Sequence, residues 1–345
     1  MAVTVSDVAR QAEVSASTVS RALAHSKLVS PATIRRVEEV AARLHYRPNK
    51  MARSLSTGKT ESLGLVVPDL ANPFFSALAK GIQAHAHRRS YSVFMADTDE
   101  DATLESVLVR QLASQSDGVI VCSPRSTTEE IESWSSCPVP LVLVNRPSAT
   151  MSSVIIDESD GMRQAVTHLA ALGHTRIAYA GGPPASWSDK TRRAAFFETM
   201  ASLDGSQATD LGHFQPFYRS GAAAADLARV SGATAVIAYN DLMALSLAQR
   251  LQSRGLVIPR DLSVVGIDGI PQSTWLTPAL TTVAVVGRTL ASTSVDALLD
   301  DDHRPNSHLV PVELIVRDST AEAPPPPTNP PHSPTRQPVM SGRPG

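Results

Sequence analysis

The first 47 residues space their apolar side chains at intervals of three and four, which predicts short amphipathic helices. Thr4 followed by Asp7 resembles a capping box and predicts a helix over residues 5–12. After a turn at residues 13–14, Ser15 is expected to cap a second helix over Ala16–Leu23. Ser30 followed by proline predicts the start of a third helix. The apolar positions of that helix form one buried face: Ile34, Val37, Val40, Ala41 and Leu44.

The pattern changes between residues 61 and 318, where short β-branched runs alternate with helical stretches such as 75–89, 161–172 and 242–254. The runs are SLGLVVPD, YSVFMAD, DGVIVCSP, VPLVLVN, SSVIID, RIAYAGG, TAVIAYND and LSVVGID. Buried strands separated by helices predict doubly wound parallel sheets. The runs are too many for one sheet, and the pattern restarts near residue 160. We therefore expect two α/β lobes, with a ligand cleft at the carboxyl ends of the strands.

Composition and charge add three expectations. Aromatic residues make up 4% of the chain, so Ala, Val, Leu and Ile must form most of the core. Two cysteines, no apolar run long enough to cross a membrane and no secretory signal favour a cytoplasmic protein. Residues 1–60 contain ten Lys or Arg against four Asp or Glu, a net charge of +6, which leaves −8 on the remaining 285 residues. A basic head favours a polyanionic partner, although a plain solvated surface is the alternative.

The stretch VSASTVSRAL, at positions 14–23, is rich in hydroxyl side chains although serine, threonine and valine are only moderate helix formers. Two short helices around a tight turn, the second capped and polar, are typical of a helix-turn-helix motif. In that motif the second helix enters the DNA major groove by its N-terminal end. Small hydroxyl and methyl groups fit against base edges and phosphates there.

The run TVSDVARQAEVSASTVSRAL, continued by VSPATIRRVEEVAARLHYRPNKMARSL, resembles the head of the LacI/GalR family of bacterial transcription regulators. The later segments LGLVVPDLANPFFSALAKGI, DGVIV, VNRP, IIDESDGMRQAVTHLAALGHTRIAYAGGP, AVIAYNDLMALSLAQRLQSRGLVIPRDLSVVGIDGI and TPALTTV resemble its sensor. The resemblance extends from residue 3 to about residue 318. It implies an all-α helix-turn-helix head followed by a two-lobed sensor similar to periplasmic binding proteins.

The resemblance also implies which residues contact DNA. Ser15, Thr18 and Ser20 would lie near phosphates, Ala16 and Ser17 would vary with operator sequence, and Arg21 would contact a base or phosphate. The segment RPNKMARSL, at positions 47–55, matches the family's hinge helix, which folds on the operator and enters the minor groove. Its expected contacts are Asn49, Arg53 and the wedge Leu55. Thr18 and Ser20 could instead only cap or face water, and the hinge segment could be a plain linker.

For the effector, the resemblance points to residues at strand ends. Phe74 or Phe75 would lie against the effector ring, the other being a core residue, and Phe214 would form a second stacking wall. Arg192 would act as a bidentate fork, with Arg193 as the alternative. Asp241 is expected to cap the following helix. The remaining expected effector ligands are Asn145, Asn240 and Asp268.

Three positions depart from the family pattern. Gly269 replaces a second acid after Asp268, Val285 stands where some sugar-sensing members carry glutamine, and Ser90 replaces a turn glycine. The first two departures leave the effector's identity open. The C-terminal part is proline-rich and lacks the leucine heptad of tetrameric members, so a homodimer is expected, with 75–86 and 287–299 at its face.

The expected domains are a head (1–47), a hinge and linker (48–60), a sensor (61–318) and a disordered proline-rich tail (319–345). Lobe 1 would comprise about 61–158 and 286–311, and lobe 2 about 159–285 and 312–318. No dinucleotide or phosphate-binding loop and no metal-ligand spacing occurs, so neither an enzyme nor a cofactor is expected. A ligand-binding protein of the periplasmic type without DNA function is the alternative.

These expectations combine into one function. The chain would be a repressor whose affinity for a pseudo-palindromic operator, with a central CG step, changes with a polyhydroxylated effector. A sugar, a sugar phosphate and a nucleoside all remain open. An inducer is favoured over a corepressor.

Overall fold

The computed structural model describes residues 3–23, 28–46, 58–285, 287–300, 302 and 304–325. The chain divides into two compact units. Unit 1 comprises Met1–Ala71, Phe75–Ile155 and Gly287–Val310, and unit 2 comprises Asn72–Phe74, Ile156–Val286 and Pro311–Gly345. The expected lobe boundaries lie close to these divisions. Residues 72–74, which the sequence placed in lobe 1, belong to unit 2 instead.

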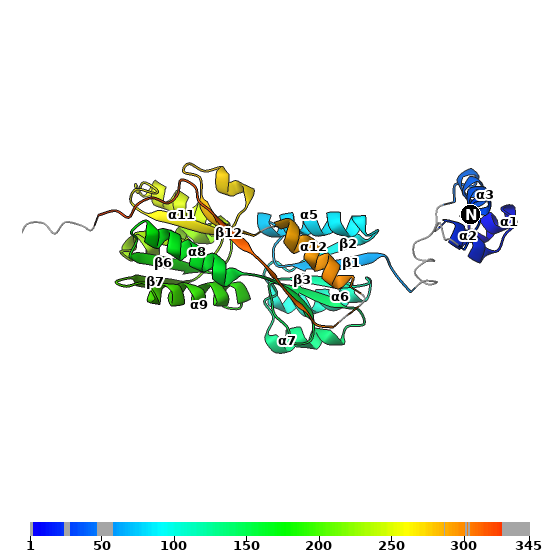
Figure 1. Cartoon of the computed structure of the whole chain (residues 1–345), viewed down its shortest axis with the longest axis horizontal. Coiled ribbons are helices and arrows are strands. Elements are labelled where there is room, and N and C mark those ends of the chain that lie inside the picture. Colours follow the sequence, from blue (N-terminus) through cyan, green and yellow to red (C-terminus); the bar gives the residue numbers. More distant parts are fainter. Residues whose placement is uncertain are drawn as a thin grey trace, which may run out of the picture. The chain divides into compact units, whose positions relative to one another are not determined.

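Within unit 1, the head is a bundle of three helices: α1 (Val5–Gln11), α2 (Ala16–Leu23) and α3 (Pro31–Arg43). Figure 1 shows them packed around one another. The Thr4–Asp7 capping box and the cap of α3 at Ser30 are present as predicted, and Glu13 in the turn has a left-handed backbone with φ 54°. The fully buried core side chains include Val8, Val19 and Val37. The predicted helices and their shared apolar face are therefore confirmed.

The rest of unit 1 is a six-stranded sheet in the order β11-β5-β4-β3-β1-β2, and the pairs from β5 to β2 are parallel. Its strands are β1 (Ser62–Val67), β2 (Ser92–Asp97), β3 (Val119–Cys122), β4 (Leu141–Val144), β5 (Ser152–Ile156) and β11 (Ser307–Val310). Its helices are α5 (Pro73–Arg88), α6 (Ala102–Ala113), α7 (Thr128–Ser133), η1 (Trp134–Ser136) and α12 (Gly287–Leu298). Every residue of β1, β3 and β4 is buried, as expected for central parallel strands.

Unit 2 repeats this plan in the order β12-β10-β9-β8-β6-β7, with only the β10–β12 pair antiparallel. Its strands are β6 (Arg176–Gly181), β7 (Gln207–His213), β8 (Ala235–Ala238), β9 (Ser263–Asp268), β10 (Thr281–Val285) and β12 (Val312–Ile315). Its helices are α8 (Glu158–Ala171), α9 (Trp187–Ala201), η2 (Tyr218–Ser220), α10 (Gly221–Val230), α11 (Asp241–Ser253) and η3 (Pro271–Thr274).

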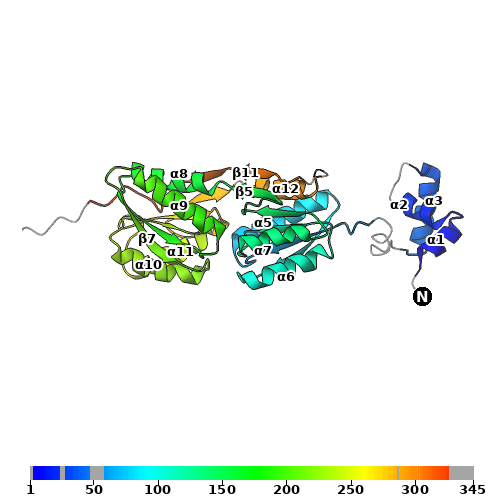
Figure 2. The same ribbon diagram turned by 90° about the horizontal axis from the view of Figure 1, so that it is seen from below.

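Helices cover both faces of the unit 2 sheet, with α8 and α9 on one face and α10 and α11 on the other (Figure 2). The core on the α10–α11 side is rich in alanine, as the scarcity of aromatic residues predicted. Gly221 lets α10 approach α11 closely, because a Cβ there would lie 2.2 Å from the carbonyl oxygen of Met243. The predicted doubly wound sheets are confirmed in both units.

The prediction of a disordered tail from residue 319 was wrong for its first residues. Ser319 is 2% exposed, and its hydroxyl donates to the Val264 carbonyl at 2.6 Å. The backbone N–H of Ala323 donates to the Leu172 carbonyl at 2.8 Å. His174, 2% exposed, lies 3.0 Å from the Ala321 carbonyl. Residues 319–323 therefore pack along unit 2, because they satisfy backbone groups at the amino ends of its strands; residues 326–345 lie outside the described residues.

The expected dimer face, at 75–86 and 287–299, stays a prediction. The apolar stripes of α5 and α12 are buried within unit 1: Ile82 is fully buried, Val295 is fully buried, and a Cβ on Gly81 would lie 2.8 Å from the Cβ of Ala291. His85 of α5 also hydrogen-bonds to Asp296 of α12 at 2.9 Å. These two helices therefore pack on each other. The exposed large apolar side chains of unit 1 include four on β2 and α6: Phe94, Met95, Leu104 and Val107.

Candidate DNA-binding head and effector site

Helix α2 divides its side chains between the core of the head and solvent. Val19 and Ala22 are fully buried, whereas the intervening face is exposed. The exposed face contains Ala16, Ser17, Ser20 and Arg21, all of which the sequence singled out for DNA contact. The i, i+3, i+4 spacing that buries one face thus presents the other as a short strip of methyl, hydroxyl and guanidinium groups.

The N-terminal end of α2 carries a cluster of hydroxyl groups. The Ser15 hydroxyl accepts from the Thr18 backbone N–H at 3.1 Å, which confirms Ser15 as the cap. It also lies 2.8 Å from the hydroxyl oxygen of Ser17 and 2.8 Å from that of Thr18. Ser20 donates to the Ala16 carbonyl at 3.2 Å. The structure therefore brings the predicted hydroxyls together at the end by which a recognition helix enters a groove.

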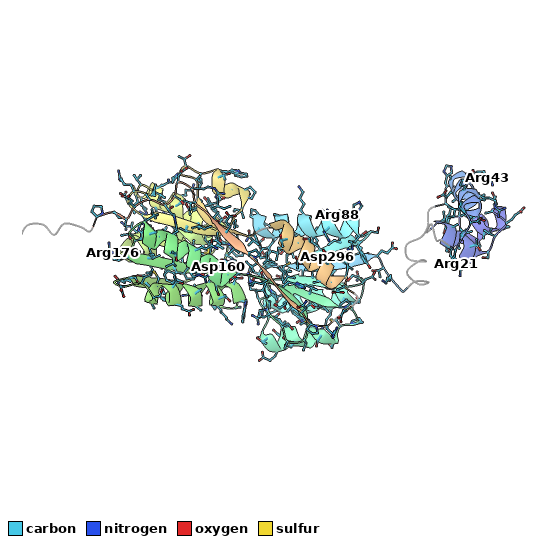
Figure 3. The ribbon with its side chains drawn as sticks, in the orientation of Figure 1. Arg21, Arg43, Arg88, Asp160, Arg176 and Asp296 are labelled. Atoms are coloured by element: carbon cyan, nitrogen blue, oxygen red, sulfur yellow. The ribbon has the colours of Figure 1, made fainter. Side chains whose placement is uncertain are left out.

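The positive charge of the head lies on exposed arginines. Arg21 of α2 and Arg35 and Arg36 of α3 are exposed. Arg43, also exposed, donates to the side-chain oxygen of Gln11 at 3.0 Å and so links α3 to α1. Figure 3 labels Arg21 and Arg43 on their helices. The other predicted DNA contacts, Asn49, Arg53 and Leu55, lie outside the described residues.

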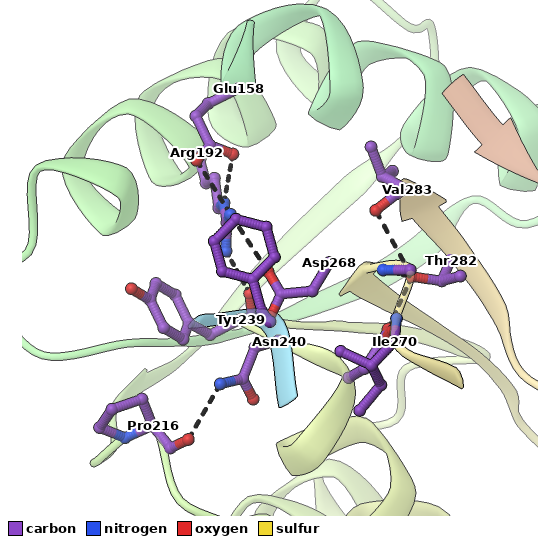
Figure 4. Close-up of polar contacts among 12 residues, drawn as sticks. Glu158, Arg192, Pro216, Tyr239, Asn240, Asp268, Ile270, Thr282 and Val283 are labelled. Atoms are coloured by element: carbon purple, nitrogen blue, oxygen red, sulfur yellow. Dashed lines mark hydrogen bonds and ion pairs between the residues drawn. The ribbon is translucent and has the colours of Figure 1, made fainter. Parts of the chain in front are cut away.

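In unit 2, Arg192 of α9 meets Glu158 at the start of α8 (Figure 4). Nε and Nη2 of the guanidinium donate to the two carboxylate oxygens at 2.6 and 2.9 Å, and Nη1 donates to the Tyr239 carbonyl. Arg192 and Glu158 are each 4% exposed. Burial lowers the pKa of Arg192, but Glu158, Tyr239 and Asp268 together outweigh this effect and the net pKa is raised. The fork expected to hold an effector thus already holds a carboxylate.

Asp268 ends β9 beside this pair. Its carboxylate lies 3.8 Å from Nη2 of Arg192, and its side chain is 9% exposed. Burial raises the pKa of Asp268 well above its usual range, Arg192 opposes the rise, and Asp241 and Glu158 add to it. Its φ of 120° is rare for a residue with a side chain, and such strain is concentrated at functional sites.

Asn240 and Asp241 follow β8, and Asn240 takes the capping role that the sequence suggested for Asp241. Asn240 is the cap of α11: its side-chain oxygen accepts from the Met243 N–H at 2.9 Å, and its amide donates to the Pro216 carbonyl at 2.9 Å. The expectation that Asp241 is the cap was therefore wrong. Its buried carboxylate accepts from the Ile270 N–H at 2.9 Å and the Thr282 hydroxyl at 2.6 Å. Burial raises the pKa of Asp241 to about 7.

The aromatic candidates occupy different surroundings. Phe75 is 7% exposed in the core of unit 1, whereas Phe74 and Phe214 are partly buried against the alanine-rich core of unit 2. Asn145 follows β4, is 3% exposed and has a left-handed backbone with φ 56°. Arg193 joins a separate network with Asp189 and Asp210. Among the expected effector residues, the structure therefore brings together Arg192 and Asp268, with Asn240 adjacent to Tyr239.

Glu158 was not among the predicted site residues. In the sequence it is one of several acidic residues at the start of a helix, a position that the helix dipole favours on its own. Its pairing with Arg192, 34 residues later, depends on how α8 and α9 pack. In the sequence, only the position of Glu158 between a strand and a helix could have indicated this role, and that position is not specific.

Comparisons with known proteins bear on both parts of the chain. Residues 4–49 match the family model described as bacterial regulatory proteins, lacI family, and residues 166–320 match a periplasmic binding protein-like domain. Catabolite control protein A of Priestia megaterium is 34% identical over 290 residues, which cover 82% of this chain and 87% of that protein. The chain belongs to the LacI family.

Solved structures agree with this membership. The lac repressor dimer bound to operator and the anti-inducer ONPF matches with a TM-score of 0.83 and 29% identity, over 93% of this chain and 100% of that one. The transcriptional regulator CelR in complex with cellobiose matches with a TM-score of 0.68 and 28% identity, over 92% and 99%. This member of the LacI family is thus a DNA-binding transcriptional regulator and not an enzyme. Among the described residues, no helix combines the length and apolar character needed to cross a membrane.

Proposed function

We propose that this LacI-family chain is a repressor that binds a pseudo-palindromic operator as a homodimer. Helix α2 of each protomer enters the major groove, with Ser15, Thr18 and Ser20 on phosphates and Ala16, Ser17 and Arg21 toward the bases. The observation that carries the proposal is the exposed polar strip of α2 above a fully buried core. The lac repressor, a structural neighbour, binds its operator as a dimer.

Residues 48–60 act as the hinge in this proposal. Asn49 and Arg53 contact the minor groove, and Leu55 wedges into a central CG step. The exposed apolar side chains of β2 and α6 offer a face for the dimer, because a monomer leaves them in water. The protein acts in the cytoplasm, at the nucleoid.

The effector is a small polyhydroxylated molecule, and its binding changes operator affinity. Arg192, Asn240 and Asp268 contact it, together with Asn145 and the aromatic side chains of Phe74, Phe75 and Phe214. Cellobiose in the CelR complex is a ligand of this class. The coupling requires that the effector bind the two sensor states with different affinity, and relief of repression by an inducer is the favoured sign.

Selection from a random duplex library tests the proposal. The full chain should enrich a pseudo-palindrome with a central CG step, whereas a shortened chain beginning at Glu61 should enrich nothing. Leu55→Ala should weaken binding to the selected duplex far more than binding to a scrambled one. No enrichment by the full chain, or equal losses on both duplexes, would contradict the proposal.

A further inference from the structure

In both units, an arginine at the carboxyl edge of the sheet forms a bidentate ion pair with a glutamate. In unit 2, two guanidinium nitrogens of Arg192 donate to Glu158, and the third donates to a backbone carbonyl. In unit 1, Arg125 follows β3 and repeats this arrangement. Its Nε and Nη2 donate to Glu100 at 2.7 and 2.9 Å, and Nη1 donates to the Ser123 carbonyl at 2.7 Å. The Arg125 and Glu100 side chains are 4% and 6% exposed.

The net charge of the group around Arg192 is negative or zero. Arg192 is the cation of the group, and both Glu158 and Asp268 lie within 3.8 Å of its nitrogens. With Asp268 ionised the three side chains carry −1, and with Asp268 protonated they carry zero. Asp241, the next carboxyl group, adds negative charge or none. Arg317, whose charge opposes the rise in the pKa of Asp241, donates from Nη1 to the Ser273 hydroxyl at 2.9 Å and to the Leu280 carbonyl.

An anionic ligand would meet this group at a disadvantage. The two nitrogens that form a bidentate fork for phosphate or carboxylate are the two that hold Glu158. A phosphate that took them would displace Glu158 and leave a buried carboxylate without its cation, which is strongly unfavourable. A hydroxyl group makes no such demand, because it can donate to Asp268 or Glu158 while the ion pair stays closed.

From this geometry we infer that the effector is an uncharged polyhydroxylated molecule, such as a free sugar or nucleoside, and that Glu158 excludes its phosphorylated forms. The inference rests on the function proposed above, within which sugar phosphates were still open. Glu158 is then a specificity-determining residue of the effector site. It acts by holding the fork of Arg192 closed to anions.

Inorganic phosphate is a probe that requires no knowledge of the effector. Titrated into the full chain at constant ionic strength, it should show no calorimetric binding that depends on Arg192. Glu158→Gln removes the competing charge and keeps a hydrogen-bonding carbonyl. This variant should bind phosphate at least about tenfold more tightly than the wild type.

Two controls test whether the gain in phosphate affinity arises at Arg192. Glu198→Gln removes an exposed charge from α9, the helix that carries Arg192, and should behave as the wild type. The double variant Glu158→Gln/Arg192→Gln should lose the gain. Phosphate bound at the basic head would be common to all four proteins and would cancel in the comparison. Equal phosphate affinity in the wild type and Glu158→Gln would overturn the inference.

A second measurement needs no variant and remains decisive if Glu158→Gln fails to fold. The wild-type chain is titrated with D-ribose, D-glucose and D-fructose and with the 5- or 6-phosphate of each. Rejection of all the esters supports the inference, and any ester that binds more tightly than its parent sugar overturns it. Neither readout contains DNA, so a failure of the proposed regulator function would appear separately, in the duplex selection.

Discussion

The recognition helix of the head exposes its polar side chains, whereas the polar side chains around Arg192 are buried and bonded to one another. On α2, Ser17, Ser20 and Arg21 face solvent above a fully buried Val19. Around Arg192, each guanidinium nitrogen has a protein partner, and Glu158 is 4% exposed. In our proposals the first surface binds a large external partner, and the second determines which small molecule is bound.

Because of this contrast, substitutions around Arg192 should affect stability, whereas substitutions on the exposed face of α2 should affect binding alone. A buried ion pair resists the loss of one partner, because the other charge remains in a poorly solvated place. An exposed side chain on a helix has little influence on folding unless it caps the helix.

The largest effect is expected for Arg192→Leu. Removing the guanidinium leaves Glu158 and Asp268 buried together, and the free energy of unfolding should fall by about 3–5 kcal/mol. Urea denaturation followed by circular dichroism measures the loss. The control is Arg163→Leu on α8, whose side chain is 61% exposed in its pair with Asp160, and which should change stability by less than about 1 kcal/mol. Equal losses would show that the buried network is not held by this pair.

A smaller effect on the free energy of unfolding is expected from the titration of Asp241. Its pKa in the folded protein is about 7, above the unfolded value of 3.8, so folding favours the protonated form. The contribution is fully present below pH 3.8 and is lost as pH rises toward 7. Between pH 5 and pH 8 this group should lower the stability by about 2–3 kcal/mol.

Asp241→Asn removes that titration and keeps oxygen and amide groups for Ile270 and Thr282. The stability of the variant minus that of the wild type should therefore increase from pH 5 to pH 8, measured by thermal unfolding at each pH. A difference that stays constant across this range would contradict the assignment of the pH dependence to Asp241.

The smallest effect compares two helix caps in the head. Ser15→Ala and Ser30→Ala each remove a hydroxyl that accepts a backbone N–H, at 3.1 and 3.2 Å, and each should lower stability by about 1 kcal/mol. Only Ser15 belongs to the hydroxyl cluster of α2. Fluorescence anisotropy should therefore show a loss of DNA affinity, about tenfold, for Ser15→Ala alone. Equal losses of affinity would mean that both caps act through folding.

The head was predictable from sequence because its signals are local. Caps at Thr4 and Ser30 and the spacing of Val37 and Val40 lie within a few residues of what they determine. The central strands were equally clear, since continuous burial requires continuous apolar runs. Strand β7 was missed because it lies at the sheet edge and its sequence QATDLGH is largely polar. Edge strands face water and need no apolar run.

The proposed effector site was less predictable because its contacts join distant segments. The sequence identified Arg192 and Asp268 as candidates, but the Glu158–Arg192 pair depends on the packing of α8 against α9. In Asn240 and Asp241 two good capping residues stand side by side, and only the tertiary bonds to Ile270 and Thr282 decide which one caps. Propensity alone cannot make that choice.

We expect the exposed strip of α2 to recognise DNA sequence. The most direct test is the equilibrium affinity of the full chain for the selected duplex and for a scrambled duplex of equal length, at one ionic strength. Because the two duplexes carry the same phosphate charge, any difference in affinity reports recognition of DNA sequence. The full chain should bind the selected duplex at least about 1,000 times more tightly than the scrambled one. Equal affinities would contradict it.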